Sequence, residues 1–80
     1  MSLEGELAQL LAEVTGHQEL AHLPPDARLF SGEAGLDSLA GTLLLRRVHE
    51  RYGVDVAAED LNLDALETLG TLAAFVTDRI

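Results

Sequence analysis

The most constraining feature of the sequence is a central segment that joins a glycine turn, a helix-capping acid and a long amphipathic helix. Asp37 is a favoured N-cap residue because its carboxylate can accept hydrogen bonds from the first helical turn. We therefore predict a helix from Ser38 to Tyr52, with Gly53 just beyond its end. Gly35, upstream, can adopt the positive φ that other residues resist. Ser38 would then lie at the positive end of the helix dipole, where a phosphate ester is favoured.

This central helix carries more apolar side chains than one buried face requires. The face predicted to be buried consists of Gly41, Leu44, Leu45, Val48 and Tyr52. Leu39 and Leu43 lie four residues apart on a different face, beside Arg46 and Arg47. Surplus apolar residues flanked by charge are candidate partner contacts. The alternative is that Leu39 and Leu43 pack beneath the long loop that precedes the helix.

Helical periodicity also predicts a first and a last helix. The first begins after the cap residue Ser2 and ends at Gly16. Its apolar face consists of Leu3, Leu7, Leu10, Leu11 and Val14. The last helix begins after the cap residue Thr68. Its apolar face consists of Leu69, Leu72, Ala73, Val76 and Ile80.

The links between these helices are irregular. Prolines and glycines in the segment 17–36 predict that no helix runs through it, and a loop this long in a small domain is often functional. The side chains expected to hold it to the core are Leu20, Leu23, Leu29 and Phe30. Val54 and Val56 alternate around Asp55, which favours a short extended link. The segment 57–67 is expected to hold one short helix. Some of its leucines are expected to turn inward, and the sequence does not resolve which of them do: Leu61, Leu63 and Leu66.

The predicted fold class is all-α: one domain over residues 1–80, folded as a small four-helix bundle with three main helices and one short third helix. The chain has no cysteine, which excludes disulfides, thiolate metal sites and a cysteine nucleophile. Its apolar runs are too short to span a bilayer, and its N-terminus lacks a signal peptide, so we expect a cytoplasmic protein without a membrane partner. A formal charge of −9 argues against nucleic acid as a partner.

A serine hydrolase is one alternative for the central serine. The segment 36–39, Leu-Asp-Ser-Leu, is similar to the Gly-Asp-Ser-Leu block of one hydrolase family. No histidine follows His49 to complete a triad, and the chain lacks the alternating strands that would place such a nucleophile. The sequence therefore argues against an esterase.

Metal sites are also disfavoured by the sequence. The segment 60–64 is similar to the first half of a calcium loop, but Ala65 stands where that loop needs glycine. Thr71 stands where it needs a bidentate glutamate. His17 and His22 do not share a helical face and lack further ligands. We therefore predict no metal site.

The central motif resembles a known family. The segment 35–39, Gly-Leu-Asp-Ser-Leu, opens a helix after a long loop that contains a Leu-Phe pair. It resembles the phosphopantetheine attachment site of acyl and peptidyl carrier proteins. The segment 52–56 resembles the family's link after its second helix, and the segment 68–72 resembles the start of its last helix. The resemblance thus covers nearly the whole chain.

The resemblance implies a carrier and not an enzyme. Ser38 would receive 4′-phosphopantetheine from coenzyme A through a separate phosphopantetheinyl transferase. The thiol of this arm would hold an acyl or aminoacyl group as a thioester. Partners would be a loading enzyme, an acyltransferase, and a ketosynthase or condensation enzyme. Asp37 would shape the turn and assist metal-dependent transfer, and Leu39 would contact the transferase and lie in the cofactor site. The segment 61–66 would flank the arm.

One departure from the family pattern bears on the pathway. Fatty-acid carriers usually bear several acids along the exposed side of the second helix, whereas Glu50 is the only acid between Ser38 and Tyr52. We therefore predict docking that is part apolar and part cationic, against acids of the partner. The residues predicted to make it are Leu39, Leu43, Arg46 and Arg47. This favours a free-standing, monomeric carrier of a polyketide or nonribosomal-peptide pathway. The alternatives are a fatty-acid carrier and an unmodified helical adaptor.

Overall fold

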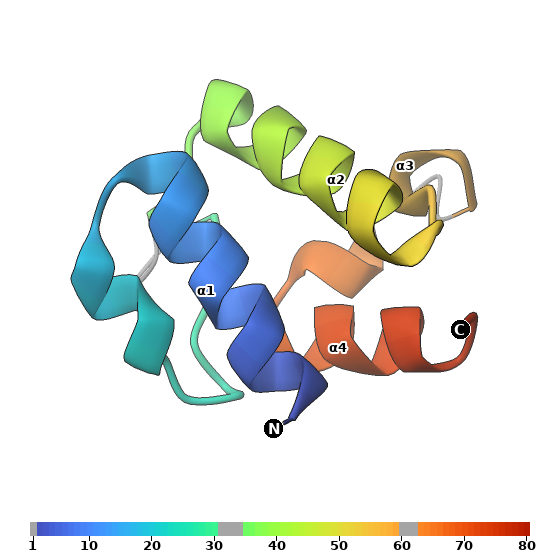
Figure 1. Cartoon of the computed structure of the whole chain (residues 1–80), viewed down its shortest axis with the longest axis horizontal. Helices are drawn as coiled ribbons and strands as arrows, with labels where there is room; N and C mark the ends of the chain where they lie inside the picture. Colours follow the sequence, from blue (N-terminus) through green and yellow to red (C-terminus); the bar gives the residue numbers. More distant parts are fainter. Residues whose placement is uncertain (1, 31–34, 60–62) are drawn as a thin grey trace.

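The fold is taken from a computed structural model of the chain, which describes residues 2–30, 35–59 and 63–80. Figure 1 shows three longer helices arranged around one core, with one shorter helix beside them. The α-helices are α1 (Leu3–Thr15), α2 (Ser38–Tyr52), α3 (Val56–Glu59) and α4 (Leu69–Thr77). Two short 3₁₀ helices are η1 (Gln18–His22) and η2 (Asp64–Leu66). The all-α, four-helix prediction with a long loop between α1 and α2 is confirmed.

The ends of the two longest helices lie where local sequence signals predicted them. The Ser2 hydroxyl accepts a hydrogen bond from the Gly5 N–H at the start of α1. The Asp37 carboxylate caps α2 in the same way. Gly16 and Gly53 end these helices with φ values of 75° and 72°, the left-handed conformation that glycine adopts without steric cost.

The core lies between α1, α2 and α4. α1 packs against both α2 and α4 (Figure 1). Large side chains of these helices that are at most 1 % exposed are Leu7, Leu11, Leu44, Val48, Leu69, Leu72 and Val76. Burying each of them contributes about 1.5–3 kcal/mol, so the apolar stripes read from the sequence are what hold the helices together.

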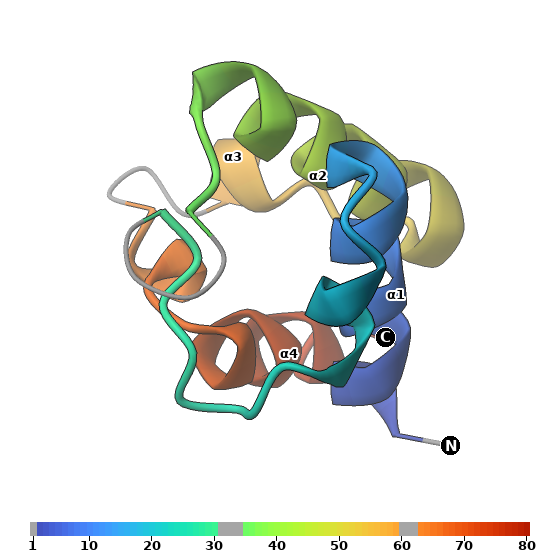
Figure 2. The same ribbon diagram turned by 90° about the vertical axis from the view of Figure 1, so that its left-hand side faces the viewer.

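The long loop is bound to the start of α4 by its backbone. The Leu29 N–H donates to the Glu67 carbonyl at 3.2 Å, and the Leu69 N–H donates to the Ala27 carbonyl at 3.1 Å. The next bond follows at Gly70, whose N–H donates to the Pro25 carbonyl at 2.7 Å. Figure 2 shows this part of the loop running beside the N-terminal end of α4. We call this set of bonds the backbone strap.

Most of the predicted loop anchors are buried, but one is not. Leu20 and Leu29 are 4 % and 0 % exposed, and Leu23 is half-buried against the core. No α-helix crosses the described part of this loop, although η1 forms within it. Phe30 is 44 % exposed, so its predicted role as a core anchor is wrong. Its ring lies against α2 at Gly41, where the absence of a side chain leaves room for it.

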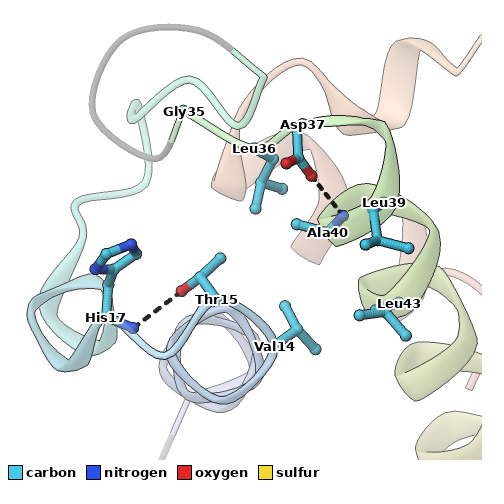
Figure 3. Close-up of a pocket in the computed structure, with 9 residues that line it drawn as sticks. All are labelled: Val14, Thr15, His17, Gly35, Leu36, Asp37, Leu39, Ala40 and Leu43. Carbon is cyan, nitrogen blue, oxygen red and sulfur yellow. Dashed lines mark hydrogen bonds between the residues drawn. The ribbon is translucent and has the colours of Figure 1, made fainter.

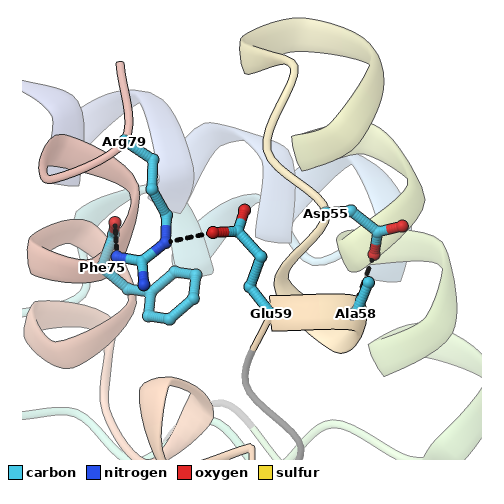
Figure 4. Close-up of polar contacts among 5 residues, drawn as sticks. All are labelled: Asp55, Ala58, Glu59, Phe75 and Arg79. Atoms are coloured by element: carbon cyan, nitrogen blue, oxygen red, sulfur yellow. Dashed lines mark hydrogen bonds and ion pairs between the residues drawn. The ribbon is translucent and has the colours of Figure 1, made fainter.

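The predicted extended link after α2 is wrong at Val56. This residue is buried and begins α3. The reason is local: the Asp55 carboxylate accepts a hydrogen bond from the Ala58 N–H at 3.2 Å, as an N-cap does (Figure 4). The alternation of valines around Asp55 therefore reflects a helix start and not a strand.

The segment after α3 and the end of α4 also depart from expectation. Of the leucines whose inward mixture the sequence left open, Leu66 is buried and Leu63 is 41 % exposed with a φ of 57°. Leu61 lies outside the described residues. Ile80 was expected on the buried face of the last helix, yet it is 66 % exposed. Regular helix ends at Thr77, so residue 80 no longer follows the helical period.

A polar contact ties α3 to α4 (Figure 4). The Arg79 Nε atom donates to the Glu59 carboxylate at 2.8 Å, and the Arg79 Nη1 atom donates to the Phe75 carbonyl at 3.1 Å. The guanidinium also lies 3.5 Å from the centre of the Phe75 ring. Because α3 is a single turn, the Arg79–Glu59 ion pair is one contact that links it to the rest of the chain, and the Phe75 ring and carbonyl hold the Arg79 guanidinium in place for it.

A hydrogen bond between α1 and α2 gives a test of their packing. The Tyr52 hydroxyl donates to the Glu6 carboxylate at 2.9 Å. Burial, together with this carboxylate, raises the pKa of Tyr52 from 10.0 to about 12. The stabilisation is therefore present in full below pH 10 and is lost as the pH rises toward about 12. We expect Tyr52→Phe to flatten this fall, as measured by urea unfolding of both proteins across that range. Equal slopes in the two proteins would contradict the assignment.

Candidate functional site

Ser38 is the first residue of α2, and its side chain is exposed. The preceding residue, Asp37, has extended backbone, and its Oδ1 atom accepts a hydrogen bond from the Ala40 N–H at 2.7 Å. The Gly41 N–H closes the first helical turn on the Asp37 carbonyl at 2.9 Å. The hydroxyl is thus presented at the N-terminus of a fifteen-residue helix, as the sequence predicted. A phosphate ester fits this position because the helix dipole favours negative charge there.

The turn before Ser38 is fixed on its inner side. Leu36 is 4 % exposed, and its N–H donates to the Leu29 carbonyl at 2.8 Å. Gly35 has a φ of 56°, a value that glycine reaches easily. Because Leu29 belongs to the backbone strap, the position of Ser38 is linked to the start of α4. The sequence motif gave no sign that Leu36 anchors the turn.

A groove of about 270 Å³ lies beside the serine, between the end of α1 and the first turns of α2 (Figure 3). The residues that line it are Val14, Thr15, His17, Gly35, Leu36, Asp37, Leu39, Ala40 and Leu43. Leu39 is 70 % exposed and Leu43 is 36 % exposed. These two leucines line a surface groove and are not covered by the described part of the long loop. The contribution from the end of α1 was not predicted, because it depends on how two helices pack.

The exposed face of α2 is cationic within an otherwise acidic chain. α2 holds three of the five arginines of the chain and one glutamate. Arg46 is exposed, whereas the Arg47 Nη1 atom lies 3.4 Å from the Glu13 carboxylate of α1. Both members of that ion pair are about half exposed, so the contact contributes little to stability. It does balance part of the Arg47 charge, which leaves Arg46 as the stronger of the two predicted cationic contacts.

The remaining titratable side chains form no second site of the kinds that the sequence raised, within the described residues. Within residues 2–30, 35–59 and 63–80, no three histidine, aspartate or glutamate side chains gather as ligands for a metal ion. His17, His22 and His49 are all exposed. The segment that is similar to a calcium loop falls largely outside the described residues. In the described part of the chain, no helix is both long enough and apolar enough to cross a membrane.

Comparison with known proteins identifies the family. Residues 5–76 match the model of the phosphopantetheine attachment site family, so the match spans nine-tenths of the chain and includes the turn, α2 and most of α4. Comparison with curated proteins and comparison with solved structures each gave no match. The matched region contains the exposed hydroxyl at the N-terminus of α2, a position suited to a phosphate ester. The chain therefore belongs to the phosphopantetheine attachment site family and is a carrier domain, not an enzyme.

Proposed function

We propose that Ser38 is the attachment residue and that the chain, as a single carrier domain, holds acyl or aminoacyl intermediates as thioesters on its arm. The observation that carries this proposal is the exposed Ser38 hydroxyl at the first position of α2, within the family match. A transferase would move phosphopantetheine from coenzyme A to the Ser38 Oγ atom. The diphosphate bond of coenzyme A would break, 3′,5′-adenosine bisphosphate would leave, and the Oγ atom would lose its proton as the phosphate ester forms. The attached thiol supplies the thioester chemistry that a chain without cysteine lacks.

Two neighbours of Ser38 have separate roles in this proposal. Asp37 uses one carboxylate oxygen to cap α2, which fixes the direction of the serine. Its exposed carboxylate also offers a ligand to a divalent cation brought by the transferase. Leu39 is 70 % exposed and lines the groove, so it is placed to be covered by the transferase and by later partners. Burial of such a side chain on docking is favourable.

The charge of α2 favours a polyketide or nonribosomal-peptide pathway over fatty-acid synthesis. A basic partner that is steered by acids on this helix would meet Arg46 and Arg47, with Glu50 as the only acid of α2. A partner with an apolar patch and acidic rim suits the surface of Leu39, Leu43 and Arg46. The identity of the acyl or aminoacyl group would be selected by the loading enzyme, and transfer assays with a panel of donors would identify it.

The attachment chemistry is tested by intact mass. Coexpression of the chain with a broad-specificity phosphopantetheinyl transferase should add the mass of one phosphopantetheine. Coexpression with an inactive transferase should add nothing. An unchanged mass with the active enzyme would contradict the proposal and would favour the unmodified adaptor.

The docking surface is tested by a charge placed on it. We expect Leu43→Glu to lower kcat/KM of the transferase about tenfold, because a carboxylate would replace a partly exposed apolar contact. The matched control is Gln9→Glu, which makes the same change in net charge at an exposed position of α1. Thermal unfolding of both variants checks the fold. A collapse of stability in Leu43→Glu would show that Leu43 belongs to the core, and an unchanged kcat/KM would show that this face does not dock the enzyme.

A further inference from the structure

A second apolar surface lies near Ser38, on the other side of α2 from the groove. A Cβ atom added at Gly41 would lie 2.6 Å and 2.7 Å from two ring carbons of Phe30. The ring thus occupies the space that a side chain at position 41 would fill, and Gly41 is buried beneath it. Phe30 is nevertheless 44 % exposed, so one side of its ring remains open. The buried Leu29 beside it and the backbone strap hold this part of the loop in place.

Helix geometry places this ring close to the serine. Residues three apart on a helix have Cβ positions about 5–6 Å apart, so the ring edge lies within about 9 Å of the Ser38 Cβ atom. At about 100° per residue, Gly41 lies about 60° around α2 from Ser38, and half-buried Leu45 lies about 20° away and about 10 Å further along the helix axis. Leu39 and Leu43 lie about 100° and 140° away in the opposite direction. The serine side chain therefore leaves α2 on the side of Phe30 and Leu45.

We propose that the Phe30 ring, together with Leu45, receives the base of the phosphopantetheine arm. This inference rests on the proposed attachment at Ser38. In this arm the phosphate is followed by a methylene and then by a carbon with two methyl groups, which is apolar and only a few bonds from the Ser38 Oγ atom. Tethering holds these methyl groups near the ring at high effective concentration. Contact with the exposed ring face removes apolar surface from water, and it would direct the arm toward the loop and away from the groove.

The test measures contact between the ring and the arm. The chain contains two phenylalanines, so ¹³C-labelled phenylalanine gives two sets of ring signals. Labelled protein without the arm is converted in vitro with unlabelled coenzyme A, and complete conversion is checked by intact mass. We expect filtered NOEs from the Phe30 ring to the arm methyl groups. The matched control is the Phe75 ring, which lies beneath Arg79 and should show none.

A second variant separates contact from chance proximity. Gly41→Ala would place its Cβ atom 2.6 Å from a carbon at the edge of the present Phe30 ring, which is too close, and the exposed ring can move away. We expect its Phe30 NOEs to weaken at least severalfold, with the mass gain unchanged. Full conversion of the wild type without Phe30 NOEs would overturn this inference alone, as would unchanged NOEs in Gly41→Ala. Failure of the wild type to gain mass would overturn the proposed attachment and this inference together.

Discussion

Replacement of Ser38 with alanine should abolish the gain of one phosphopantetheine that the wild type shows. The reason is chemical: alanine has no oxygen to form the phosphate ester. The fold should survive, because the Ser38 side chain is exposed and the Asp37 cap of α2 remains. Intact mass after coexpression with a broad-specificity transferase measures the gain, and thermal unfolding checks the fold.

The matched control for this experiment is Thr42→Ala. Thr42 carries another exposed hydroxyl on α2, one turn beyond Ser38, and its Oγ1 atom donates to the Ser38 carbonyl at 2.9 Å. The control should keep the full mass gain. Modification of Ser38→Ala would contradict the assignment of Ser38, and loss of modification in Thr42→Ala alone would place the attachment at Thr42.

Leu44→Ala should have the largest effect on stability among the α2 variants considered. Leu44 is 0 % exposed and lies between α2 and the rest of the core. Removing such a side chain leaves a cavity and costs about 2–5 kcal/mol. An 80-residue domain is stable by about 4–12 kcal/mol in total, so the loss is a large fraction of it. Urea unfolding measures the difference.

Leu39→Ala is the matched control, because it makes the same substitution in the same helix. Leu39 is 70 % exposed, so its truncation should change the free energy of unfolding by about 0.5 kcal/mol or less. The same variant should still slow the transferase if Leu39 is a docking contact. Equal destabilisation by the two substitutions would contradict the burial described for α2.

The bounds of α2 were predictable because the signals that set them are local. Asp37 accepts the N–H of Ala40, three residues on, and Gly53 ends the helix through its own backbone conformation. Neither signal needs another part of the chain. The position of Ser38 at the start of the helix follows from them, which is why the candidate attachment residue could be named from the sequence.

Features that depend on packing could not be predicted in this way. The groove beside Leu39 forms only because the end of α1 meets the start of α2. The Phe30 ring packs on Gly41, a helix residue eleven positions further along the chain. The sequence shows only that Phe30 is apolar and that Gly41 is small, so it does not predict that the two residues meet. Val56 is a different case. Asp55 is a local cap signal, but the valines on either side of it also favour an extended link, and the two signals conflict.

The backbone strap bears on how this domain can change over evolution. It is made of main-chain N–H and carbonyl groups, and the Leu36 N–H joins it to the turn before Ser38. Main-chain bonds do not depend on which side chains are present, unless proline removes a donor. Most exposed positions of this loop can therefore acquire new side chains, and so new binding specificities, while the serine keeps its place.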